Sequence, residues 1–260
     1  MRWAMAEPSG EPDEGSARLA PPFPPFRLNP SLDAEALAAQ FALRRRVQIA
    51  DFLAPECAAA LHAQLRARGD WRQVVNSGAN VYDLDRATRS RLSPVEAAAL
   101  DEAVYVGARR GFQYRYESIR VPDDPAARHA SSDPLAAFAA FMSSGEARDL
   151  LRSVAGCDAI EFADAQATAY SPGDFLTAHD DDVPGKGRVA AYVLSLTSGW
   201  RGDWGGNLLF HSDDGLSVDG FVPRFNALNL FAVPQLHSVS IVSRAAPYRR
   251  YSVTGWLRTG

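Results

Sequence analysis

The pattern of apolar and polar positions divides the chain into a mixed first half and a strand-rich second half. In the first half, apolar residues recur at helical spacing in several windows, and two short alternating runs flank the turn-forming residues Asn76-Ser77-Gly78-Ala79. This pattern predicts helices over residues 32–42, 55–68, 93–111, 134–142 and 145–154, strands over 46–53, 71–75, 80–84 and 112–120, and loops over 85–92 and 122–132.

From residue 160 onward the chain consists of short alternating or apolar runs that are separated by Gly, Pro and Asp, with no helical window between them. The expected strands cover residues 160–170, 174–181, 188–197, 205–211, 217–222, 226–232, 237–243 and 248–258. An uninterrupted series of short strands is typical of a β roll built from two sheets. The predicted fold class is therefore α+β, with helices first and an antiparallel β core after them.

The composition of the N-terminal stretch sets it apart from the rest. Residues 1–30 are rich in Pro, Gly, Glu and Ser, so they have too little apolar surface to compensate for the entropy of ordering. We predict a flexible lead over residues 1–30 and one domain over residues 31–260. Within that domain, residues 31–159 form a helical and β support, and residues 160–260 form the β-roll core.

The overall composition limits the partners and the environment. A chain of 260 residues with 47% hydrophobic residues can bury a sizeable core. The net charge of 27 − 31 = −4 provides no basic field for nucleic acid or an anionic membrane. Two cysteines are too few for a disulfide framework, and no run approaches the roughly 18 apolar residues of a membrane span. We therefore expect a cytoplasmic protein without a nucleic-acid or membrane partner.

A histidine and an acid stand two residues apart in the second half, at His179 and Asp181, and His237 follows a later predicted strand. Residues i and i+2 of a strand project from the same face. Two imidazoles and one carboxylate can occupy one face of an octahedral ion and leave three positions open, as in non-haem Fe(II) oxygenases. Taken alone, the spacing also fits a solvated acidic turn. Asp180 and Asp182 should face solvent or cap a turn.

The last predicted strand carries a possible anion anchor. Arg250 and Ser252 lie on one face of it, and a guanidinium with a neighbouring hydroxyl can hold a carboxylate such as the distal end of 2-oxoglutarate. The single lysine, Lys186, lies in a predicted turn. Arg249 is a weaker candidate because it should face the other side of the strand. His211 is a weaker second histidine because the run after it resembles a turn.

Several longer motifs surround these residues. They are Tyr170-Ser171-Pro172-Gly173-Asp174-Phe175-Leu176 before the first histidine, Trp204-Gly205-Gly206-Asn207-Leu208, and Arg250-Tyr251-Ser252-Val253-Thr254-Gly255-Trp256. With them, the sequence resembles the Fe(II)- and 2-oxoglutarate-dependent dioxygenases. Within that superfamily it is similar to the prolyl-hydroxylase branch, in particular to the ribosomal-protein prolyl hydroxylases and their bacterial relatives.

The resemblance implies a double-stranded β-helix (jelly-roll) core and a role for each candidate residue. His179, Asp181 and His237 would hold Fe(II) as the catalytic centre. Arg250 would bind the far carboxylate of 2-oxoglutarate, assisted by Ser252, and Tyr170 would lie against this co-substrate. The interval from His237 to Arg250 (250 − 237 = 13) is a little longer than is usual in the family.

The implied activity is that of a dioxygenase that consumes O2 and 2-oxoglutarate, hydroxylates a C–H bond and releases succinate and CO2, with ascorbate as an additional reductant. The resemblance favours a prolyl residue of a protein or peptide as substrate, and residues 75–92 as a cover over it, with a solvated loop as the alternative. Other readings are a hydroxylase of a free amino acid or small metabolite, a slowly turning over 2-oxoglutarate and oxygen sensor, and a zinc hydrolase. A zinc hydrolase would leave Arg250 and Ser252 without a role.

Overall fold

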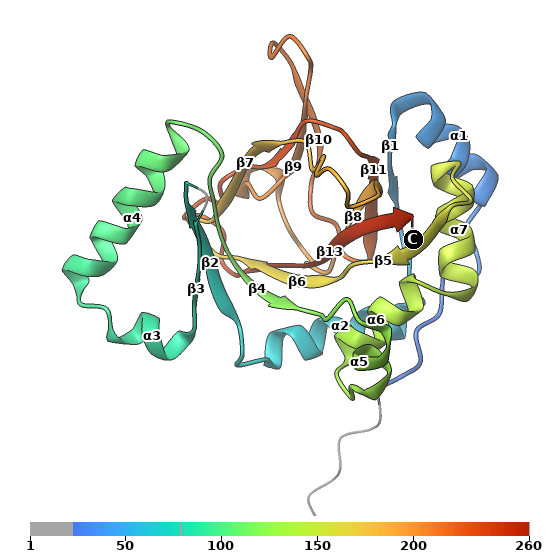
Figure 1. The fold of residues 1–260 in the computed structure, drawn as a ribbon, viewed down its shortest axis with the longest axis horizontal. Helices are drawn as coiled ribbons and strands as arrows, with labels where there is room; N and C mark the ends of the chain where they lie inside the picture. Colours follow the sequence, from blue (N-terminus) through green and yellow to red (C-terminus); the bar gives the residue numbers. More distant parts are fainter. Residues whose placement is uncertain (1–22, 79, 260) are drawn as a thin grey trace, which may run out of the picture.

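The structure is a computed structural model that describes residues 23–78 and 80–259, and it shows a β barrel with helices around its outside (Figure 1). The helices are α1 (Ala34–Arg44), α2 (Pro55–Ala67), α3 (Arg86–Arg91), α4 (Pro94–Ala108), α5 (Pro125–Ala130), α6 (Pro134–Met142) and α7 (Gly145–Ala155). The strands before residue 160 are β1 (Arg46–Ile49), β2 (Arg72–Ser77), β3 (Asn80–Leu84) and β4 (Tyr114–Arg120). Those after it are β5 (Ile160–Ala163), β6 (Gln166–Tyr170), β7 (Phe175–His179), β8 (Arg188–Ser195), β9 (Leu208–His211), β10 (Val218–Phe221), β11 (Ala227–Ala232), β12 (His237–Val239) and β13 (Arg250–Thr259).

The strands pair in the order β1-β11-β8-β13-β6-β4-β7-β12-β9-β10, with β2 and β3 extending outward from β4 and β5 pairing with the end of β13. The pairings between these strands are antiparallel. At the two ends of this path, Arg46 Nη2 of β1 lies 2.9 Å from Asp219 Oδ2 of β10, so the sheet curls into a nearly closed barrel. The predicted jelly-roll core with supporting helices is confirmed.

The main hydrophobic core lies between the outer face of the barrel and the helices. Leu61 and Leu65 of α2 and Phe138 of α6 are fully buried there, against Val253 and Leu257 of β13. Side chains alternate along a strand, so the residues of β13 that alternate with Val253 and Leu257 point into the barrel. The alternation of β13 thus covers the core on one side and builds a cavity on the other. No helix in the described parts of the chain is both long and apolar enough for a membrane span.

Part of the predicted N-terminal lead is packed. The Phe26 ring lies 5.4 Å from that of Phe138, and the backbone N–H of Ala54 donates to the carbonyl of Arg27 at 3.0 Å. Leu28 forms a β bridge with Leu53. Residues 23–30 are therefore part of the packed structure, whereas residues 1–22 lie outside the described residues.

Two predicted loops are wrong, because α3 and α5 form there. Each of these helices has six residues, which is too short to produce a helical period in the sequence. Both begin with an aspartate cap: Asp85 accepts from the N–H of Thr88 at 2.6 Å, and Asp124 from the N–H of Ala126 at 3.1 Å. The strand that was expected over residues 160–170 is two strands, β5 and β6, which a break at residues 164–165 separates.

Candidate active site

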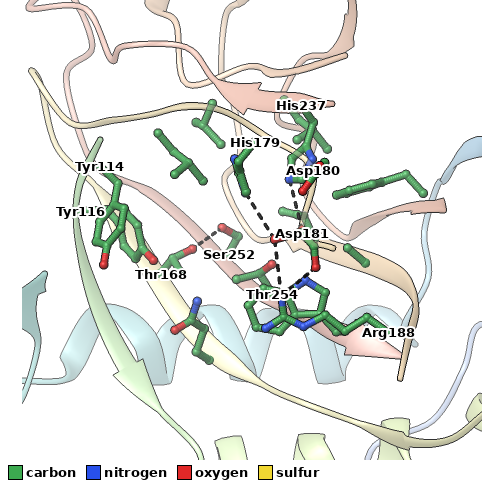
Figure 2. A pocket seen from close by; sticks show the side chains of 18 of the residues that line it. Tyr114, Tyr116, Thr168, His179, Asp180, Asp181, Arg188, His237, Ser252 and Thr254 are labelled. Atoms are coloured by element: carbon green, nitrogen blue, oxygen red, sulfur yellow. Dashed lines mark hydrogen bonds and ion pairs between the residues drawn. The ribbon is translucent and has the colours of Figure 1, made fainter. Parts of the chain in front are cut away.

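A cavity of about 380 Å³ lies inside the barrel, and its walls come from both halves of the sheet (Figure 2). One wall carries the inward residues of β6 and β13, and the opposite wall carries the ends of β7 and β12. All the residues that the sequence predicted for the site line this cavity: Tyr170, His179, Asp181, His237, Arg250 and Ser252.

The two histidines and the aspartate meet at one end of the cavity. His179 ends β7 and His237 begins β12, and the two residues are directly paired across these strands. Asp181 lies between them, with its Oδ1 3.4 Å from Nε2 of His179 and its Oδ2 3.4 Å from Nε2 of His237. One possible ligand atom from each residue lies within 4.8 Å of the others, so the three side chains can hold one metal ion.

Backbone contacts orient each ligand. Nδ1 of His179 lies 3.0 Å from the carbonyl of Thr177, and Nδ1 of His237 lies 2.7 Å from the carbonyl of Gln235. An Nδ1–H that donates to a carbonyl leaves the lone pair of Nε2 free for a metal, which is the usual support of a histidine ligand. Asp181 has a positive φ of 64°, which turns its carboxylate back toward the histidines after the end of β7.

The protonation states also favour metal binding. Burial, reinforced by the neighbouring His179, lowers the pKa of His237 to about 4, so this imidazole is neutral at neutral pH. Burial alone would raise the pKa of Asp181, but the two histidine rings, each with its Nε2 3.4 Å from a carboxylate oxygen, outweigh burial and lower that pKa. A neutral imidazole and an ionised carboxylate are the forms that bind a divalent cation.

Arg250 lies deep in the same cavity and is only 2% exposed. Within residues 23–78 and 80–259, its Nε has no hydrogen-bond partner, and the centroid of the Tyr170 ring lies 5.1 Å from its Cζ. Burial lowers the pKa of Arg250. An unpaired buried cation is unfavourable unless an anion joins it, so this guanidinium favours a carboxylate ligand in the cavity. Arg249 faces the other side of the sheet, as predicted, where it pairs with Glu117.

Ser252 and Tyr170 extend this wall. The Ser252 hydroxyl lies 2.7 Å from that of Thr168 (Figure 2). The Tyr170 ring stacks on Tyr116 with 5.1 Å between centroids. Thr168 and Tyr116 are cavity residues that the sequence reasoning did not identify. A signal for Thr168 was available, since it has the same strand parity as Tyr170. Tyr116 belongs to the alternating aromatic run at residues 112–120, but the local sequence does not show which strand pairs with this run.

The neighbours of Asp181 have separate roles. Arg188 Nη1 donates to the backbone carbonyl of Asp181 at 3.0 Å, and its Cζ lies 3.6 Å from the ring centroid of Trp256. Asp180 and Asp182 are exposed at the cavity mouth. Asp180 Oδ1 accepts from the N–H of Asp182 at 3.1 Å, so the expectation of a turn cap is confirmed.

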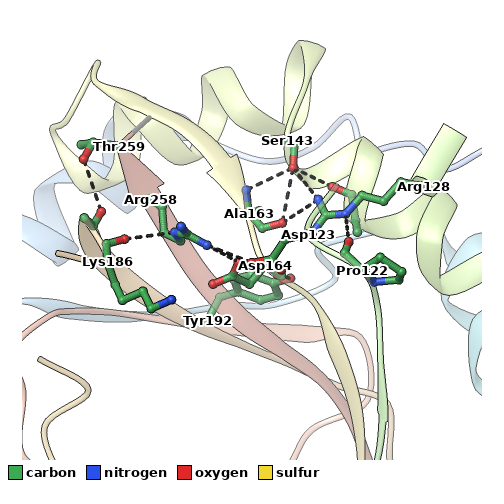
Figure 3. Close-up of polar contacts among 12 residues, drawn as sticks. Pro122, Asp123, Arg128, Ser143, Ala163, Asp164, Lys186, Tyr192, Arg258 and Thr259 are labelled. Carbon is green, nitrogen blue, oxygen red and sulfur yellow. Dashed lines mark hydrogen bonds and ion pairs between the residues drawn. The ribbon is translucent and has the colours of Figure 1, made fainter. Parts of the chain in front are cut away.

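His211, Tyr192 and the segment 75–92 lie away from the three ligands. His211 Nε2 contacts the Ser238 hydroxyl at 2.8 Å and is not part of the three-residue cluster. Tyr192 is fully buried on the other face of β8, where its hydroxyl donates to the carbonyl of Asp164 at 2.6 Å (Figure 3). The described residues of the segment 75–92 do not line the cavity that contains the histidines.

The residues present fit the groups that the sequence implied. The donor set of two histidines and one carboxylate is the facial set of non-haem Fe(II) sites. The unpaired guanidinium of Arg250 provides a buried cationic position for a dicarboxylate in the same cavity. Fold and site together define the class: a jelly-roll protein with the metal site of a non-haem iron oxygenase and a position for an anionic co-substrate.

Comparison with known proteins specifies this class further. Residues 165–258 match the model of the 2OG-Fe(II) oxygenase superfamily. Over 116 residues, the chain is 34% identical to prolyl 3-hydroxylase OGFOD1 of Mus musculus. The matched segment covers 42% of this chain and 21% of that protein. The identity to prolyl 3-hydroxylase OGFOD1 of Xenopus laevis is also 34%, over 42% of this chain and 22% of that protein. The chain spans about a fifth of the length of these curated relatives.

Solved structures show the same fold. A Pseudomonas putida prolyl-4-hydroxylase superposes with a TM-score of 0.55 at 21% identity, covering 88% of this chain and 100% of that one. A prolyl hydroxylase from Trichoplax adhaerens, in complex with a peptide fragment of the hypoxia inducible factor oxygen degradation domain, superposes with a TM-score of 0.56 at 16% identity. This second match covers 87% of this chain and 89% of that one.

Proposed function

We propose that the protein is an Fe(II)- and 2-oxoglutarate-dependent dioxygenase that hydroxylates a prolyl residue of a protein or peptide and releases succinate and CO2. The observation that carries this proposal is the unpaired, buried guanidinium of Arg250 in the cavity that also contains the His179–Asp181–His237 cluster. A zinc hydrolase with the same three ligands would have no use for a buried cation at that position.

Each side chain has a defined task in this reaction. His179, Asp181 and His237 hold the iron, which when bound supplies the activation of O2 for attack on a C–H bond. Arg250 binds the distal carboxylate of 2-oxoglutarate, and Ser252 lies two residues away on the same face of β13. The stacked rings of Tyr116 and Tyr170 form a wall beside Arg250 that keeps water from this ion pair.

The prolyl part of the proposal is supported by the relatives. The curated relatives are named prolyl 3-hydroxylases, and one structural relative was solved with a peptide fragment. The cavity mouth, where Phe112 is 49% exposed and Tyr114 adjoins it with 5.5 Å between ring centroids, provides apolar aromatic surface for a pyrrolidine ring. Ascorbate as a reductant and a cytoplasmic location belong to the same proposal.

The first test is binding. Anaerobic titration of the metal-free protein with Fe(II) and then with 2-oxoglutarate should produce the visible charge-transfer band of an iron–2-oxoglutarate complex. The same titration of Arg250→Met should require far more 2-oxoglutarate for the band. If no band develops in the wild type, the proposed function is wrong.

The second test is the substrate. Proline-containing peptides should stimulate succinate formation and gain the mass of one oxygen, whereas free proline should do neither. Stimulation by free amino acids alone would instead support a hydroxylase of small metabolites. Parallel reactions with and without ascorbate test the reductant, because only a protein that uses ascorbate sustains more turnovers in its presence.

A further inference from the structure

A buried carboxylate stands on the outer face of the barrel, behind the wall that carries Arg250. Glu117 of β4 is 1% exposed, and two arginines from distant parts of the chain pair with it. Nη1 of Arg89 in α3 donates to Oε1 at 2.5 Å, whereas Nη1 of Arg249 lies 2.8 Å from Oε2 as an ion pair without hydrogen-bond geometry. The proposed function assigns no task to these three residues.

The sheet connects Glu117 directly with the strand of Arg250. Glu117 of β4 is paired with Ala169 of β6, and Ala169 is paired with Tyr251 of β13, so these three residues form one row across the sheet. Arg249 is the residue immediately before β13, and Arg250 is the first residue of that strand. The ion pair with Glu117 therefore fixes the chain at the point where β13 begins.

This attachment matters because Arg250 has little else to direct it. Its Nε has no acceptor among the described residues, and the centroid of the Tyr170 ring lies 5.1 Å from its Cζ. A Cβ on Gly206 would lie 3.0 Å from Cδ of Arg250, so the space around the stem is narrow. With no hydrogen bond to hold Nε, the direction of the guanidinium depends on the position of its backbone. That position is the first one of a strand, where local fraying is easiest.

We propose that Glu117 is a positioning residue for Arg250. By holding Arg249 against the outer face of the sheet, it fixes the backbone from which Arg250 reaches into the cavity, and so it sets the affinity for the co-substrate. This inference rests on the proposed function, in which Arg250 binds 2-oxoglutarate. Arg89 shares the same carboxylate but belongs to α3, a helix without buried residues, so loss of Arg89 should not move β13.

The two arginines provide a matched pair of variants, because their side chains are similarly exposed, at 33% for Arg89 and 31% for Arg249. KM for 2-oxoglutarate and kcat are measured for wild type, Arg249→Met, Arg89→Met and Glu117→Gln. We expect Arg249→Met and Glu117→Gln to raise the KM for 2-oxoglutarate about fivefold, which corresponds to about 1 kcal/mol. Both variants should keep kcat near the wild-type value. Arg89→Met should leave the KM within about twofold of wild type, a change below 0.5 kcal/mol. Fe(II) affinity should be the same in all four proteins.

Two results would overturn the inference: an Arg249→Met KM equal to that of wild type, or equal increases in the two arginine variants, which would indicate general loosening. Arg250→Met, measured alongside, separates this failure from failure of the proposed function. If Arg250→Met binds 2-oxoglutarate as well as wild type, the proposed function is wrong and the inference falls with it. If only Arg250→Met is impaired, the inference alone is wrong. Should Glu117→Gln not fold, the two arginine variants decide the question.

Discussion

Replacement of Arg250 by methionine should stabilise the ligand-free protein while it abolishes co-substrate binding. The Arg250 guanidinium is buried, and no carboxylate pairs with it in the described parts of the chain. Burial of an unpaired charge costs several kcal/mol, of which a Tyr170 ring at 5.1 Å recovers about 1–2 kcal/mol. Methionine has a similar length and no charge. The free energy of unfolding should therefore rise by about 1–3 kcal/mol.

The effect on 2-oxoglutarate should have the opposite sign. A guanidinium that grips a carboxylate makes two charge-assisted hydrogen bonds, each worth about 1.5–2 kcal/mol. Loss of about 3–4 kcal/mol weakens binding by about 150-fold to 800-fold. Few buried residues increase the stability of the protein and weaken ligand binding this strongly when they are replaced. The two opposite effects together therefore indicate a residue whose role is to bind a ligand.

Urea denaturation of the Fe(II)-loaded protein under anaerobic conditions measures both effects. At a 2-oxoglutarate concentration of 100 times Kd, the wild type should gain about 2.7 kcal/mol of stability, and Arg250→Met at the same concentration should gain almost nothing. A matched control is Arg128, which is also buried but donates to the carbonyls of Pro122 and Ala163 at 2.6 and 3.0 Å (Figure 3). Arg128→Met should destabilise the protein by about 2–3 kcal/mol, because it leaves buried carbonyls without donors.

If Arg250→Met lowers stability as much as Arg128→Met and still responds to 2-oxoglutarate, the predicted role of Arg250 is wrong. In that case Arg250 would be an ordinary structural residue, and the carboxylate position in the cavity would be lost as an argument for the co-substrate.

Three further predictions concern other parts of the site. Asp181→Ala removes the only carboxylate of the metal cluster, so iron content after desalting should fall to background, and retained iron would contradict the ligand assignment. Burial raises the pKa of Asp174 from 3.8 to about 6, so the folded state binds more protons between these values. Stability should therefore fall by about 2 kcal/mol as pH rises from about 4 to about 6. Denaturation at both pH values should show a smaller change in Asp174→Asn, and equal changes would contradict the assignment. A Cβ on Gly205 would lie 1.9 Å from the carbonyl oxygen of Ile241, so Gly205→Ala should yield little soluble protein. Gly206→Ala meets mainly side-chain atoms and should only lower Tm by a few degrees; similar yields and Tm values for both would contradict this.

The sequence predicted the candidate metal ligands, but the strand alternation used for His179 and Asp181 explains their positions only in part. Strand parity placed His179 and Asp181 on one face, yet β7 ends at His179, and Asp181 reaches the cluster through a left-handed backbone conformation after the strand. Parity was a good guide for Arg250 and Ser252, because β13 is regular at both positions. Periodicity describes a strand well and says little about the residues just beyond it.

The contacts that complete the site depend on pairing between distant segments. The Glu117–Arg249 pair joins residues 132 positions apart (249 − 117), and it requires the register of β4, β6 and β13. The direct pairing of His237 with His179 depends on the register of β7 and β12 in the same way. No local pattern encodes these registers, since each strand alternates equally well against several partners. The sequence could therefore predict which residues face inward but not which of them touch.

The two functions of the cavity are carried by different parts of the barrel. The metal cluster belongs to the ends of β7 and β12, and Arg250 belongs to β13 on the other side of the path, with β6 and β4 between them. Only two residue pairs, Tyr114 with Leu176 and Arg115 with Phe175, join β4 to β7. A change at Arg250 therefore leaves the metal ligands on their own pair of strands undisturbed. Arg250→Met should retain as much iron as wild type while it loses 2-oxoglutarate, and simultaneous loss of iron would show that the two sites are not independent.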